Sequence, residues 1–72
     1  DRGASWFTTA EVFAELDKKD EATFALKLAV FFSKNREQAI ASLKDKSKIE
    51  SDKFWKIIED ARPVLSGVPA AN

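Results

Sequence analysis

The 72-residue sequence lacks cysteine, histidine and tyrosine, and it has only two glycines and two prolines. Without cysteine, the chain has no disulfide, no thiolate metal ligand and no thiol nucleophile. Histidine is the usual acid–base group at neutral pH, so its absence removes the commonest catalytic group. Gly3 and Gly67 lie near the chain ends, which excludes a glycine-rich phosphate loop. With no G-x-S-x-G motif either, we expect a protein that is not an enzyme and needs no cofactor or metal.

The sequence also has no excess of charge of one sign and no long apolar run. Twelve basic and twelve acidic side chains cancel, so no overall field draws the chain to nucleic acid or to an anionic membrane. The longest charge-free apolar run, residues 28–32, is far shorter than the roughly 20 residues that span a bilayer, so we expect no membrane span. Apolar residues make up 44% of the chain, a value typical of folded domains. We expect one helical domain over residues 1–65 and a flexible tail over residues 66–72.

Helix signals are what the sequence does contain, and they predict an all-α, compact bundle of four short helices at about residues 9–19, 21–33, 36–45 and 52–62. The first helix is expected to begin after Thr8, which forms a capping box with Glu11. Phe7 and Val12 occupy the positions of a hydrophobic staple. The inward stripe predicted for this helix consists of Ala10, Val12, Phe13 and Leu16.

The segment 22–32, ATFALKLAVFF, is the most apolar part of the chain and fits two patterns. Its alternation resembles that of a strand. Helix is favoured because alanine and leucine dominate, and because no second strand candidate exists for it to pair with. Asp20 is expected to cap this helix, with Glu21 in the first turn. We expect Phe24, Leu28 and Phe31 to point inward.

The third helix has a weaker capping signal, Asn35 with Gln38. Its inward residues are predicted to be Ala39, Ile40 and Leu43. The polar stretch at residues 44–50 is interpreted as a connection, and Ile49 is its one apolar anchor.

The fourth helix has the clearest pattern in the chain. Ser51 is the expected N-cap. The inward residues follow the i, i+3, i+4, i+7 rule and are Phe54, Ile57, Ile58 and Ala61. Pro63 has no N–H and disfavours helical geometry at Arg62, so we expect the helix to end there.

Six phenylalanines and two tryptophans are more aromatic residues than the centre of so small a bundle holds. Phe32 lies with the small Ala25 and Ala29 on the face next to the inward one, and Trp55 lies on the flank of the fourth helix. These positions predict a non-catalytic protein–protein interaction module that binds a protein partner or another copy of itself. The residues predicted to bind the partner are Lys27, Phe31, Phe32 and Trp55. The competing structural interpretation is that Trp55 covers the bundle edge and Trp6 packs under the tail.

Two other classes of function remain open from the sequence. Residues 35–61 also fit a helix-turn-helix-like nucleic-acid module, because five lysines lie between positions 44 and 56 against three acidic residues. The connection is longer than the usual turn of about 3–4 residues, which makes this the weaker interpretation. Acidic residues at 17, 20 and 21 and at 59 and 60 permit a carboxylate enzyme in principle, but carboxylates near helix ends are more simply explained as solvated charges.

Overall fold

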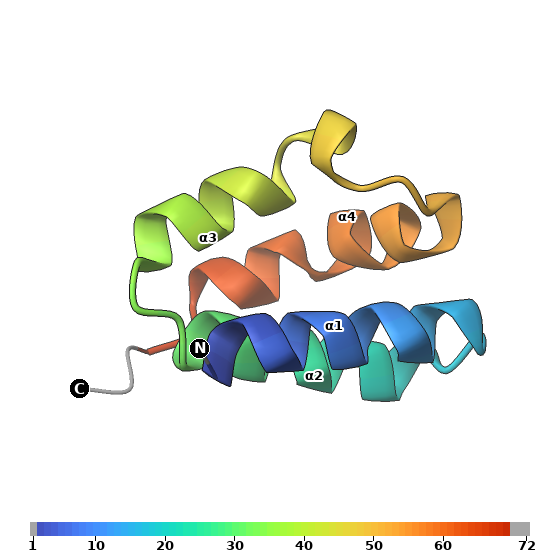
Figure 1. Ribbon diagram of the computed structural model, residues 1–72, viewed down its shortest axis with the longest axis horizontal. Coiled ribbons are helices and arrows are strands. Elements are labelled where there is room, and N and C mark those ends of the chain that lie inside the picture. The colour runs from blue at the N-terminus through green and yellow to red at the C-terminus, as the bar shows by residue number, and fades with distance from the viewer. Residues whose placement is uncertain (1, 70–72) are drawn as a thin grey trace.

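The computed structural model describes residues 2–69, which form four α-helices and one 3-10 turn (Figure 1). The elements are α1 (Arg2–Glu15), α2 (Lys19–Phe31), α3 (Arg36–Leu43), η1 (Lys46–Lys48) and α4 (Asp52–Ser66). Residues 2–69 contain no strand, which confirms the predicted all-α bundle of four helices and rejects the strand interpretation of residues 22–32. Within the same residues, no helix is both long enough and apolar enough to cross a membrane.

Helices α1 and α2 form an antiparallel hairpin, whose two arms make the most extensive contact between any two elements (Figure 1). α1 ends in a Schellman motif, in which the Lys18 N–H donates to the Phe13 carbonyl at 2.9 Å and the Asp17 N–H donates to the Ala14 carbonyl at 3.1 Å. Asp17 takes the left-handed conformation with φ 58°, which aspartate tolerates better than most residues. The helix therefore ends at Glu15 and not near residue 19 as predicted.

The predicted start of the first helix is wrong, because α1 begins at Arg2. Thr8 lies inside the helix, where its hydroxyl donates to a backbone carbonyl one turn earlier at 3.2 Å, so it forms no capping box. The predicted staple is also wrong, since Val12 is exposed and the Phe7 ring packs edge-on against Phe54 with centroids 5.3 Å apart. Packing of this kind holds residues 2–7 in a helix without a capping signal.

Helix α2 begins two residues earlier in the chain than predicted. Lys18 is the N-cap residue and makes no side-chain cap hydrogen bond, so the predicted cap at Asp20 is wrong. Asp20 and Glu21 do lie in the first turn, where carboxylates interact favourably with the positive end of the helix dipole. The helix ends at Phe31, two positions before the predicted end.

Helix α4 packs across the hairpin and closes the core (Figure 1). Its four predicted inward residues are all buried, as is Leu65. The largest fully buried side chains are Leu26, Val30, Phe54 and Ile58. These come from α2 and α4, so the centre of the core lies between these two helices.

The predicted cap of α4 is confirmed, because the Ser51 hydroxyl accepts a hydrogen bond from the Phe54 N–H at 3.2 Å. The same hydroxyl donates to the carboxylate of Glu15 at the end of α1. Ser51 therefore provides an acceptor for a backbone N–H in the first turn of α4 and joins this helix to the hairpin.

We expect Ser51→Ala to lower the free energy of unfolding by about 1 kcal/mol, the usual cost of losing an N-cap. Urea denaturation followed by circular dichroism measures this change. Ser51→Thr is the matched control, because threonine keeps the hydroxyl that both bonds use. An alanine variant as stable as the threonine variant would contradict the capping role.

Helix α4 continues through Pro63 to Ser66, so its predicted end at Arg62 is wrong. Pro63 offers no N–H to the carbonyl of Glu59, but its ring lies on an exposed part of the helix. Continuing for one more turn buries Leu65, of which 3% remains exposed. This apolar burial offsets the hydrogen bond that the proline removes.

Helix α3 and η1 form the outer arm of the fold (Figure 1). The Asn35 cap is confirmed, since its side chain accepts from the Gln38 N–H at 3.0 Å. α3 ends at Leu43, which is buried, and the predicted extension to residue 45 is wrong. Ile49 is buried and anchors the connection, as predicted. Within that connection, hydrogen bonds from the Ser47 hydroxyl and N–H hold the pKa of Asp45 below its ordinary value.

The predicted tail begins inside the helical part of the fold. Ser66 is the last residue of α4, and Val68 packs against the core. Residues 70–72 lie outside the described residues. The domain boundary at residue 65 stays a prediction.

Candidate interaction surface

The outward face of α2 is the face that the sequence analysis assigned to the core. The buried residues of this helix are Ala22, Ala25, Leu26, Ala29 and Val30. Phe24 is 60% exposed, and Lys27, Leu28 and Phe31 are half-buried. The predicted inward set of Phe24, Leu28 and Phe31 is therefore wrong. We call Phe24, Lys27, Leu28 and Phe31 the α2 surface.

Small side chains explain this reversal. Ala10 and Ala14 are buried on α1, and the three alanines of α2 are buried on its inward face. Helix axes approach more closely where the side chains between them are small. At Gly3 the approach is so close that a Cβ atom would lie 2.8 Å from the carbonyl oxygen of Ala29. Close packing of the hairpin therefore takes the alanines inward, together with Leu26 and Val30, and leaves Phe24, Leu28 and Phe31 on the opposite face.

The same packing exposes residues that were predicted to be inward on α1. Val12 is 54% exposed and Leu16 is 60% exposed, while Phe13 is half-buried. Val12 and Leu16 border an open recess of about 500 Å³ that Glu11 and Glu15 also line. The spacing of the alanines in α1 and α2 is the sequence signal that could have identified Val12 and Leu16 as exposed. The faces that carry the alanines are the inner faces of the hairpin, and Val12 and Leu16 lie on the other side of α1.

Phe31 and Phe32 form one aromatic pair at the end of α2. Their rings meet edge-to-face, with centroids 4.9 Å apart and planes at 82°. The guanidinium of Arg2 lies 5.7 Å from the centroid of Phe32, so α1 covers part of this ring. Ala25 and Ala29, which were expected to accompany Phe32 on a partner-binding face, are buried. That part of the predicted face is wrong.

Trp55 belongs to α4 and is not part of the α2 surface. It packs partly buried against the core, and the Arg62 guanidinium lies 4.8 Å from the centroid of the indole ring system. Arg62 in turn borders a small recess with Ile40 and Leu43. Of the four residues predicted to bind a partner, Lys27 and Phe31 share the outward face of α2, Phe32 lies at its edge, and Trp55 is elsewhere.

Two of the five carboxylates that suggested an enzyme, Asp17 and Asp60, are paired with lysines on the surface. Asp17 lies 3.4 Å from the Lys53 ammonium, and Asp60 lies 3.1 Å from that of Lys19. Both ion pairs are exposed and join α4 to the hairpin, and each contributes at most about 1 kcal/mol. Among residues 2–69, no three potential metal ligands of the acidic, histidine or cysteine type gather at one place.

Comparisons with protein-family models, with curated proteins and with solved structures found no match to this chain. The α2 surface is the feature of the fold from which a function is proposed.

Proposed function

We propose that this chain is a small, non-catalytic protein-interaction module that binds through the α2 surface. The observation that carries the proposal is Phe24, which is 60% exposed on a helix whose inward face is already filled. Leu28 and Phe31 follow it along the same face at i+4 and i+7, so the apolar surface is continuous over two turns. Contiguous exposed apolar surface on a small domain is typical of a binding site.

The partner we infer is a second copy of the chain, packed in antiparallel orientation across a two-fold axis near Lys27. This orientation places Phe24 of one copy against Phe31 of the other. It also brings Asp20, at the start of one helix, close to Lys34, just beyond the end of the other. Both residues are exposed. Each end of the contact therefore pairs a carboxylate of one copy with an ammonium group of the other, and the two helix dipoles are antiparallel.

Sedimentation across a concentration series tests this proposal. We expect the wild type to dimerise reversibly, and Phe24→Gln to lower the association constant by at least about 10-fold, because both copies lose buried apolar surface. Val64→Gln is the matched control, since Val64 is 47% exposed on α4, away from the α2 surface. A wild type that stays monomeric at every concentration would overturn the proposal.

Lys27 provides a second arm of the same test. Near a two-fold axis the two ammonium groups repel each other, and two carboxylates in Lys27→Glu repel each other equally. A mixture of wild type and Lys27→Glu is therefore expected to associate more tightly than either protein alone. A mixture that associates no better than its components would place Lys27 away from the axis and contradict the inferred register.

Trp55 is not part of this proposed surface, because its ring already packs against the core and lies beside Arg62. The nucleic-acid alternative rests on Lys44, Lys46 and Lys48, which are exposed around η1. Lys53, a fourth lysine of that region, is paired with Asp17. Salt-dependent binding to random duplex DNA that Phe24→Gln leaves unchanged would favour this alternative over the proposed module.

A further inference from the structure

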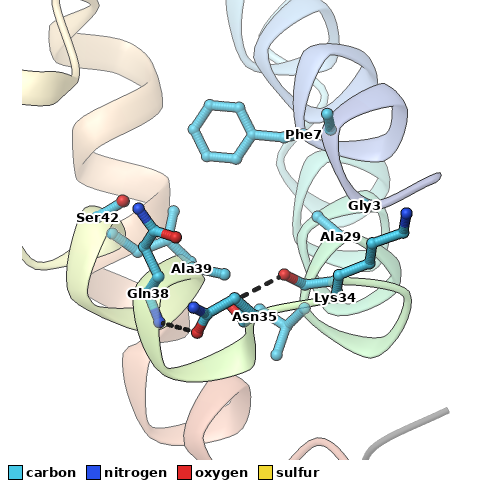
Figure 2. A pocket seen from close by; sticks show the side chains of 12 residues that line it. Gly3, Phe7, Ala29, Lys34, Asn35, Gln38, Ala39 and Ser42 are labelled. Atoms are coloured by element: carbon cyan, nitrogen blue, oxygen red, sulfur yellow. Dashed lines mark hydrogen bonds between the residues drawn. The ribbon is translucent and has the colours of Figure 1, made fainter. Parts of the chain in front are cut away.

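The pocket beside α3, of about 540 Å³, lies between this helix and the hairpin (Figure 2). Phe7 and Ala29 belong to its apolar wall on the hairpin, and Gln38 and Ser42 face the space from α3 (Figure 2). Lys34 is the one charged residue among the described residues that line it, and its ammonium group points away (Figure 2). Charge therefore identifies no class of ligand for this pocket.

The open recess beside Leu16, which we call the Leu16 recess, has a more definite chemistry. Val12 and Leu16 lie four residues apart on α1 and form an apolar row, of which 54% and 60% are exposed. Glu11 and Glu15 have the same spacing and form an acidic row directly beside the apolar one. The recess of about 500 Å³ therefore combines exposed apolar surface with negative charge.

A third carboxylate borders the Leu16 recess from the other side of the fold. Glu50 lies in the connection before α4 and lines the recess together with Ser51. The Ser51 hydroxyl donates to the Glu15 carboxylate, which places that carboxylate where the end of α1 meets the start of α4 (Figure 1). Among residues 2–69, neither Glu11 nor Glu50 forms an ion pair, and no lysine or arginine lines the recess.

Two helix ends meet at the Leu16 recess, and their partial charges offset each other. α1 ends there with negative partial charge, and no basic residue lies in its last turn. α4 begins there with positive partial charge, but Ser51 caps it and Asp52 lies in its first turn. Lys53 is already paired with Asp17. The three glutamates therefore determine the sign of the charge in the recess.

We propose that the Leu16 recess binds a basic amphipathic helix of another protein. Leucine-type side chains of that helix pack on the row of Val12 and Leu16, in the manner of a helix seated in a groove. Lysine or arginine side chains beside them meet the glutamates, and this charge complementarity selects the partner and sets its orientation. The α2 surface does not suit the same partner, because Lys27 lies at its centre.

Two peptides of about 12 residues are matched probes: AKKLAKKLAKKA, with leucines four residues apart, and AEELAEELAEEA, with the opposite charge. In amide-resolved NMR titrations at physiological ionic strength, we expect the basic peptide to shift the signals of Glu11, Val12, Leu16 and Glu50. We also expect it to bind at least about 10-fold more tightly than the acidic one. Absence of saturable shifts, equal affinity for both peptides, or shifts confined to the α2 surface would each overturn the proposal.

Two pairs of variants test the apolar and the acidic row separately. Leu16→Gln is expected to weaken binding of the basic peptide at least about 5-fold, whereas Val64→Gln, on an exposed position of α4, leaves it unchanged. Glu11→Gln is expected to weaken binding about 2- to 5-fold, whereas Glu59→Gln, an exposed glutamate that does not line the recess, leaves it unchanged. Equal effects within either pair would place the peptide elsewhere and contradict the proposal. Because every titration is repeated with Phe24→Gln, the outcome does not depend on dimerisation.

Discussion

Phe54→Ala is expected to lower the free energy of unfolding by about 3–5 kcal/mol, because it removes a fully buried aromatic ring and leaves a cavity. Phe54 has no exposed surface, and its ring meets Phe7 edge-on at 5.3 Å. It thereby joins the middle of α1 to the start of α4. A domain of 72 residues has a free energy of unfolding of about 4–11 kcal/mol, so this single truncation removes a large part of the stability of the fold.

Phe24→Ala is the matched control for Phe54→Ala, because it makes the same chemical change on the outward face of α2. Phe24 is 60% exposed, and we expect its truncation to cost less than about 1 kcal/mol. Urea denaturation of both variants, at a concentration where the chain is monomeric, measures the difference. Equal losses would contradict the assignment of Phe24 to the surface and would return it to the core.

The parts of the fold that the sequence predicted correctly are those with contrast between apolar and polar positions. In α4, each buried residue from Phe54 to Ala61 has a charged residue next to it in the sequence, and Ser51 marks the start. Asn35 marks the start of α3 by the same local chemistry, a side-chain oxygen that accepts from the backbone. Such signals depend on neighbours in the chain, so a sequence contains them in full.

The orientation of α2 could not be predicted in this way, because its outward face is as apolar as its inward face. Choosing between the two faces requires the distance between α1 and α2, which depends on pairs such as Gly3 and Ala29 that are far apart in the sequence. The three alanines of α2 are buried there, whereas Phe24, the larger side chain, is exposed. The prediction of where α1 starts was wrong for a related reason, because the first turns of this helix are stabilised by packing and not by a cap.

The candidate binding residues were likewise predicted only in part. The sequence identified α2 as having more apolar surface than one small core buries, and Phe31 and Lys27 do lie on its outward face. It missed Phe24, the most exposed aromatic residue of that face, because Phe24 had been assigned to the core. The pocket beside α3 had no sequence signal, because its lining residues come from α1, α2 and α3 and are far apart in the sequence.

Gly3→Ala is expected to lower the free energy of unfolding by about 1–3 kcal/mol, although alanine is the better helix former. The added Cβ atom would lie 2.8 Å from the Ala29 carbonyl oxygen and 3.0 Å from the Cα atom of Ser33. Both are backbone atoms, so no side-chain rotation relieves the contact and the two helices must move apart. That movement loosens the alanine packing on which the whole hairpin depends.

Gly67→Ala is the control that separates this packing effect from the general effect of replacing glycine. At Gly67 the nearest atom to an added Cβ is the Val64 carbonyl oxygen at 3.6 Å, an ordinary contact, and φ is −92°. Alanine fits there and restricts the unfolded chain, so we expect a change between zero and a gain of about 1 kcal/mol. Thermal and urea denaturation of the two variants should therefore give changes of opposite sign or, at the least, a clear loss only for Gly3→Ala. A Gly3→Ala protein as stable as the wild type would mean that α1 and α2 do not approach through their alanines, and the outward position of Phe24 would lose its physical cause.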